Sequence, residues 1–169
     1  MEEASKAVGE VGLRPGEAAR RRQVALYSLG EAARHAGAGA WGRAFPHYLV
    51  AAGLHPEAFV RQQEAFLAAA GGLAARLAAA GREAQVEEVY EQAVAVLPHP
   101  ELLTNFGSFL FIRGETARAE QLYRRALAVD PLFLLARDRL ENLASSLLPR
   151  CTCTCSCTCT CTLGGISRC

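Results

Sequence analysis

Several features that mark particular classes of protein are missing from this sequence of 169 residues. Its net charge of +1 at pH 7 is too small for binding driven by bulk positive charge, so we expect no nucleic-acid partner. The longest apolar run, 65–75, has eleven residues, whereas a membrane-spanning helix needs about 20, so we expect no membrane insertion. The opening residues, Met1-Glu2-Glu3, lack the basic and apolar stretches of a signal peptide. We therefore expect a cytoplasmic protein, with the nucleus as an alternative compartment.

Cysteine is absent from the first 150 residues, and all seven cysteines lie in the last 19. The core therefore does not depend on disulfides. In 151–162, cysteine alternates with threonine or serine, and we interpret 149–169 as a disordered tail of low complexity. Thiolates two residues apart can also bind soft metals, so metal binding by the tail is a weaker alternative. We assign no metal ligand elsewhere.

Aromatic residues make up only 7% of the chain, whereas alanine occurs 32 times. Abundant alanine with few β-branched residues favours helix over sheet. A pattern of Gly, Tyr, Ala and Pro then recurs three times, with spacings of 9, 3 and 5 residues within each copy. The second and third copies are 33 residues apart and the first and second are 42 apart. The copies are Gly39, Tyr48, Ala51, Pro56; Gly81, Tyr90, Ala93, Pro98; and Gly114, Tyr123, Ala126, Pro131.

This spacing has a physical explanation in paired helices. Glycine ends a first helix, because it adopts a left-handed conformation without steric cost. The tyrosine and the alanine three residues later share one face of a second helix, and proline ends that helix. A single pair cannot bury its apolar face, so pairs must stack. We therefore expect the tyrosines and Trp41 to pack in a core, rather than to stack on bases, and the histidines to pack rather than to bind metal.

The pattern resembles the tetratricopeptide repeat. The resemblance implies an all-α fold, an alpha-alpha superhelix of about three tetratricopeptide-type helical hairpins plus a capping helix. Residues 1–22 are polar and charged and are interrupted by Pro15 and Gly16, so we expect a flexible leader there, with the repeats and cap at 23–148. The best copy, 101–131, has Gly107 at the small position of its first helix.

Other parts of the repeat region depart from the family pattern. We expect one long helix over 57–80, weakened by Gly71-Gly72, and Pro46 departs from the pattern unless its helix starts near it. The amphipathic segment 132–148 is the expected cap, with Ala136, Leu140, Leu143 and Leu147 on its apolar side.

A closer resemblance covers roughly 24–150. Segments 46–50, 90–94 and 136–144 are similar, in order and spacing, to the N-terminal repeat region of the protein arginine N-methyltransferase 9 family. In that family the repeats precede an S-adenosylmethionine-dependent domain that makes symmetric dimethylarginine on a splicing factor. No Gly-rich cofactor loop and no acidic pair for a guanidinium is visible here. The resemblance thus implies a truncated form, an interaction module without catalytic residues or cofactor; a generic adaptor unrelated to methylation is the alternative.

The resemblance also implies a binding groove lined by the first helix of each pair. Its partner would be a protein or peptide, with a splicing factor as the specific candidate. Some tetratricopeptide proteins hold a peptide's carboxylate there with Lys, Arg and Asn, and only Asn105 matches here. We therefore expect no capture of chaperone tails and a small, apolar groove, which a missing domain could also cover. Its candidate residues are Leu26, Leu29, Ala33, Ala75, Ala78, Glu101, Thr104, Asn105, Ser108 and Phe111.

Overall fold

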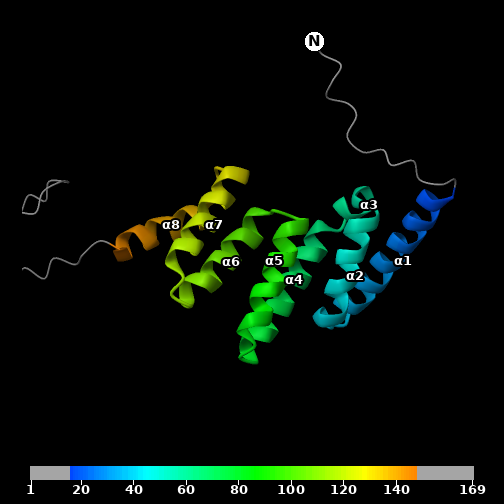
Figure 1. Ribbon diagram of the computed structural model, residues 1–169, viewed down its shortest axis with the longest axis horizontal. Helices are drawn as coiled ribbons and strands as arrows, with labels where there is room; N and C mark the ends of the chain where they lie inside the picture. Colours follow the sequence, from blue (N-terminus) through cyan, green and yellow to red (C-terminus); the bar gives the residue numbers. More distant parts are fainter. Residues whose placement is uncertain (1–15, 148–169) are drawn as a thin grey trace, which may run out of the picture.

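The computed structural model describes residues 16–147, and within that range every regular element is a helix (Figure 1). The expected all-α fold is therefore confirmed for this part of the chain. The leader residues 1–15 and the Cys/Thr tail lie outside the described residues. The helices are α1 Glu17–Gly37, α2 Trp41–Leu54, α3 Pro56–Val60, α4 Gln63–Ala79, α5 Glu83–Val96, α6 Pro100–Ile112, α7 Thr116–Val129 and α8 Leu134–Leu147.

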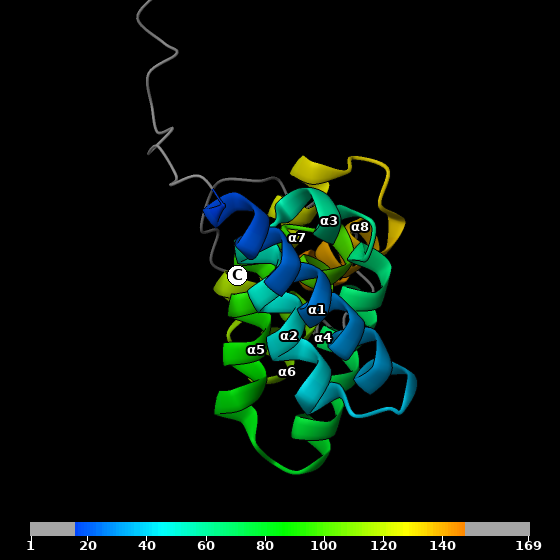
Figure 2. The same cartoon turned by 90° about the vertical axis from the view of Figure 1, so that its right-hand side faces the viewer.

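Three helical hairpins stack side by side in chain order. They are α1 with α2, α4 with α5, and α6 with α7, and α8 packs against α7 and α6. In Figure 1 the order runs from α1 at the right to α8 at the left, and Figure 2 views the stack from the α1 end. This is the expected superhelix of tetratricopeptide-like hairpins with a capping helix. No helix in 16–147 combines the length and apolarity needed to span a bilayer.

Each hairpin turns at a glycine with the same geometry. Gly39, Gly81 and Gly114 have φ of 67°, 69° and 84°, where a side chain would be strained. The amide of the residue that follows each glycine donates to a carbonyl five residues back, at 2.9 Å in all three turns. This is the hydrogen bond of a glycine-ended helix, so the glycine spacing sets the hairpins.

The repeat positions form the core. Tyr48, Tyr90 and Tyr123 are 0%, 8% and 1% exposed, which confirms that they pack inside. A small residue lies sixteen positions before each tyrosine and is also buried: Ala32, Ala74 and Gly107. A Cβ placed on Gly107 would lie 2.6 Å from Cε1 of Tyr123, so the ring occupies the space that a side chain would need.

Aromatic rings join one hairpin to the next. Phe66 of α4 stacks on Phe45 of α2, with ring centroids 5.6 Å apart. Tyr90 of α5 stacks on Phe106 of α6 at 5.4 Å. Both contacts cross a boundary between hairpins. The apolar core is therefore continuous along the stack, as expected for units that cannot fold alone.

The expected long helix over 57–80 is wrong. The chain forms α3, breaks at Arg61 and Gln62, and resumes as α4. Phe59 and Phe66 explain the break. In one continuous helix they would lie about 10 Å apart along the axis, whereas their ring centroids are 5.1 Å apart and both rings are buried. Folding α3 back places both rings in one core.

Other boundaries differ from the expectation in smaller ways. Helix α1 begins at Glu17, six residues before the expected start of the repeats, directly after Gly16 with φ 94°. Pro46 lies inside α2, which starts five residues earlier. Helix α4 runs unbroken through Gly71 and Gly72. The cap begins at Leu134 rather than at 132 and buries its apolar side as expected, with Ala136 0% and Leu143 2% exposed and Leu140 partly buried.

Candidate functional site

The predicted groove residues differ in their exposure to solvent. Leu26 and Phe111 are 50% and 41% exposed, and Ala33, Ala75, Ala78 and Glu101 are also exposed. Asn105 and Ser108 are half-buried. Leu29 is buried, and Thr104 is fully buried, with its hydroxyl donating to the carbonyl of Pro100 at 2.8 Å. Thr104 therefore lies on the buried face of α6 and cannot contact a ligand.

Three of the predicted residues share a cavity on α1. Leu26, Leu29 and Ala33 line a cavity of about 510 Å³, and its opposite wall is α3 with its flanking residues, including Glu57 and Arg61. The break after Val60 creates this wall, because it folds α3 back against α1. The cavity thus lies between α1 of the first hairpin and α3 with its flanking residues.

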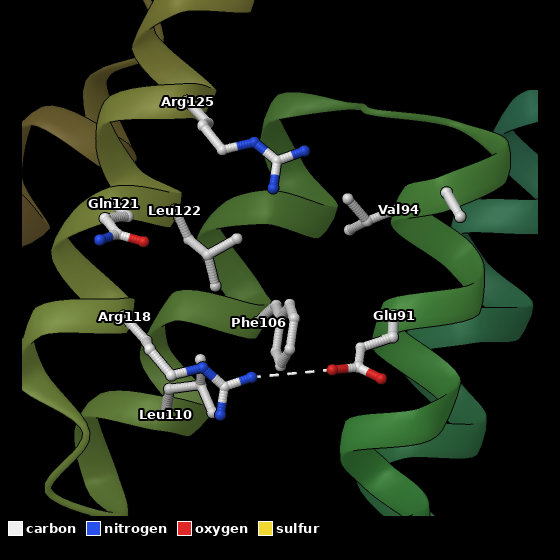
Figure 3. A pocket seen from close by; sticks show the side chains of 9 residues that line it. Glu91, Val94, Phe106, Leu110, Arg118, Gln121, Leu122 and Arg125 are labelled. Atoms are coloured by element: carbon white, nitrogen blue, oxygen red, sulfur yellow. Dashed lines mark ion pairs between the residues drawn. The ribbon is translucent and has the colours of Figure 1, made fainter.

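A second cavity lies between α5 and α7, where no candidate residue was predicted. Its floor is Phe106 and Leu110 of α6, and its walls carry Val94 and Leu122 (Figure 3). The volume is about 370 Å³. The other residues that line it are Glu91, Ala95, Arg118, Gln121 and Arg125. An apolar floor with a polar, charged rim is the usual composition of a binding pocket. We define this cavity as the α5–α7 groove.

Ion pairs fix the lower rim of the α5–α7 groove in Figure 3. Nη1 of Arg118 lies 2.8 Å from Oε1 of Glu87 and 2.6 Å from Oε2 of Glu115. Its Nη2 lies 3.7 Å from Oε1 of Glu91, across the groove. Arg113 adds a contact to Glu87 at 2.6 Å. Hydrogen bonds donated by Arg118 and then Arg113 lower the pKa of Glu87, and the hydrogen bonds that Arg118 donates to Glu115 and Glu87 raise the pKa of Arg118. These charges satisfy one another and hold the second hairpin to the third.

Arg125 differs from Arg118. Its guanidinium extends toward the groove from α7 in Figure 3, and it forms no ion pair with any residue of 16–147. It therefore offers a free, permanently charged donor beside the apolar floor. Sequence reasoning missed this site because it considered only the first helix of each pair. The available signal was the row of Arg118, Leu122 and Arg125 along one face of α7.

The described part of the chain offers no group of three metal-ligating side chains. The proposed thiolate site would be in the Cys/Thr tail, which lies outside the described residues. Metal binding there stays a prediction.

Comparison with known proteins finds two relatives that are much longer than this chain. No family model matches the chain. Human protein arginine N-methyltransferase 9 is 30% identical over 134 residues, which are 79% of this chain and 16% of that protein. Protein adenylyltransferase Fic of Nematostella vectensis is 40% identical over 53 residues, which are 31% of this chain and 12% of that protein. The chain therefore spans only a small part of either relative.

Two solved structures are also similar. The first TPR domain of human RPAP3, solved by NMR, has a TM-score of 0.47 and 17% identity, covering 75% of this chain and 94% of that one. The first TPR of Spaghetti (RPAP3), bound to the HSP90 peptide SRMEEVD, has a TM-score of 0.49 and 18% identity, with the same coverage. The buried repeat positions and the three stacked hairpins make the described chain tetratricopeptide-like, and over most of its length it is similar to a small part of protein arginine N-methyltransferase 9.

Proposed function

We propose that this chain is a protein-interaction module that holds a segment of a partner protein in the α5–α7 groove. One observation carries the proposal: an open cavity of about 370 Å³ with Phe106 in its floor and an unpaired Arg125 beside it. An apolar side chain of the partner would lie over the small exposed parts of Phe106 and Leu122, which are 5% and 6% exposed. A neighbouring Asp or Glu would pair with Arg125, because that guanidinium has no partner in 16–147. We assign no catalytic step to these residues.

The finer proposal connects the module to arginine methylation. It rests on the similarity to human protein arginine N-methyltransferase 9 over 79% of this chain. On this proposal the module would hold a methyltransferase substrate, such as a splicing factor, and S-adenosylmethionine would be bound by another domain. A cytoplasmic or nuclear location belongs to the same proposal. A generic adaptor that takes no part in methylation is the alternative, and it would use the same groove.

A peptide-display selection on the full chain tests the interaction proposal. We expect the selected peptides to combine an apolar residue with a nearby Asp or Glu. Arg125→Glu should weaken their binding by at least about tenfold, because the substitution removes one charge-assisted hydrogen bond and adds a repulsion. Arg139→Glu on α8 makes the same charge change on an exposed residue away from the groove and is the matched control. Equal effects of the two substitutions would contradict the proposal.

Two further probes separate the finer alternatives. The splicing-factor substrate of the methyltransferase family should bind the wild-type chain and lose binding in Arg125→Glu if the module serves methylation. If that substrate does not bind while selected peptides do, the generic adaptor is the better description. The peptide SRMEEVD tests the expectation that chaperone tails are not captured.

A further inference from the structure

A third cavity contains an unbalanced cluster of arginines. It lies where the α1–α2 turn meets the α4–α5 turn, at the lower edge of the stack in Figure 1. Arg43 of α2, Arg76 of α4 and Arg82, which precedes α5, line a cavity of about 400 Å³. Among the described residues, no acidic side chain lines it. We define this cavity as the arginine pocket.

Within the described range, no carboxylate neutralises these three arginines. None of them forms an ion pair with a residue of 16–147. Arg76 is oriented by its neighbouring hairpin, because its guanidinium donates to the carbonyl of Gly39 at 3.1 Å. Three positively charged side chains therefore line one hollow without an ion-pair partner in 16–147. An anion that entered would supply that partner.

The next boundary between hairpins shows the contrast. At the corresponding end of the stack, Arg113 contacts Glu87 at 2.6 Å and Glu115 at 3.3 Å, and Arg118 contacts both carboxylates. The arginines there neutralise acids of the chain itself. In the arginine pocket, by contrast, the three guanidinium groups pair with no acidic side chain of 16–147.

The composition of the pocket selects a class of ligand. Guanidinium groups stay charged and present paired donors that match oxyanions, and three of them suit the dianion of a phosphomonoester better than a single carboxylate. Leu73 and Leu77 form an apolar wall beside them, and no aromatic ring of the described residues lines the pocket, so a nucleotide base would find no stacking partner. We propose that the arginine pocket binds a phosphorylated serine or threonine of a partner peptide, with an apolar neighbour of that residue against the leucines. The pocket shares no residue with the α5–α7 groove, so this inference is independent of the proposed function.

Calorimetric titration of the full chain tests this proposal. The probe is a short peptide with one phosphoserine flanked by leucines, compared with its unphosphorylated form and with inorganic phosphate. We expect both comparison ligands to bind at least about tenfold more weakly, because each lacks either the charge or the apolar contact. If inorganic phosphate binds as tightly as the phosphopeptide, the pocket takes a free anion and the peptide assignment is overturned. Binding to vesicles that contain a phosphoinositide would likewise overturn it in favour of a lipid headgroup.

Substitutions locate the binding within the chain. Arg43→Gln and Arg82→Gln should each weaken the phosphopeptide by at least about tenfold. Arg43→Lys retains the charge without the paired donors and should give a smaller loss. Arg139→Gln removes the same charge from α8 and should change the affinity less than about twofold. An equal loss in Arg139→Gln would show non-specific attraction and refute the site, and unchanged circular dichroism spectra exclude misfolding as the cause of any loss.

Discussion

Helix α4 contains two adjacent glycines that the structure distinguishes by their surroundings. A Cβ placed on Gly72 would lie 2.7 Å from Nε1 and 2.8 Å from Cε2 of Trp41, which is closer than carbon atoms normally approach. A Cβ placed on Gly71 would meet no atom within 4 Å. The same substitution at neighbouring positions of one helix should therefore have opposite effects on stability.

The magnitudes follow from two opposing contributions. Alanine is favoured over glycine inside a helix by about 1 kcal/mol, at either position. Gly71→Ala should raise the free energy of unfolding by about that amount. At Gly72 the added methyl group also displaces the indole of Trp41, and overpacking of this kind costs about 2 kcal/mol. Gly72→Ala should therefore lower the free energy of unfolding by about 1 kcal/mol, and the two variants should differ by roughly 2 kcal/mol.

Urea denaturation followed by circular dichroism measures this difference. The chain has one tryptophan, so fluorescence of Trp41 reports the same contact directly. Trp41→Ala supplies the control, because without the indole Gly72→Ala should become as stabilising as Gly71→Ala. If Gly72→Ala and Gly71→Ala are equally stable in the presence of Trp41, the packing of the first hairpin on the second is not as described.

Three other predictions concern the core and the ion pairs. Gly107→Ala should lower the free energy of unfolding by about 1 kcal/mol, because overlap of its methyl group with the buried Tyr123 ring, which costs about 2 kcal/mol, outweighs the gain of about 1 kcal/mol from alanine inside a helix; thermal melting measures this. Tyr48→Phe should leave the free energy of unfolding unchanged or raise it by up to about 1 kcal/mol, because the buried Tyr48 hydroxyl has no hydrogen-bond partner in 16–147. Tyr123→Phe loses the 3.3 Å hydrogen bond to Ser108 and should lower the free energy of unfolding by about 0.5–1 kcal/mol. The pKa of Glu87 is lowered in the folded protein, so its contribution to stability is present above its ordinary pKa of 4.5 and is lost as the pH falls through the lower, folded value. Glu87→Gln should therefore make Tm fall less steeply in acid. An unchanged dependence of Tm on pH would contradict the ion-pair assignment.

The hairpins could be predicted from the sequence because their determinants are local. Gly39, Gly81 and Gly114 each end a helix, because each adopts a left-handed backbone conformation. The spacing from each tyrosine to the alanine three residues later follows from the helical repeat, which places both on one face. The break before α4 could not be predicted, because Arg61 and Gln62 carry no turn signal of their own. It is imposed by the contact of Phe59 with Phe66, which depends on the packing of three helices.

The candidate sites show the same division between local and tertiary information. The resemblance to the tetratricopeptide repeat placed Leu26 and Phe111 among the groove candidates, and both are exposed. The repeat pattern could not reveal that Thr104 is fully buried, because its burial depends on how other helices pack on α6. The α5–α7 groove and the arginine pocket each combine residues from two hairpins. They depend on how the hairpins stack, which repeat spacing does not specify.

Nuclear Overhauser measurements test most directly whether the helical hairpins form one continuous stack. The account predicts cross-peaks between the indole protons of Trp41 and the Hα protons of Gly72, which join the first hairpin to the second. It also predicts cross-peaks between the ring protons of Tyr90 and Phe106, which join the second to the third. Folded hairpins that lack both sets of cross-peaks would contradict the stack and remove the basis for the α5–α7 groove and the arginine pocket.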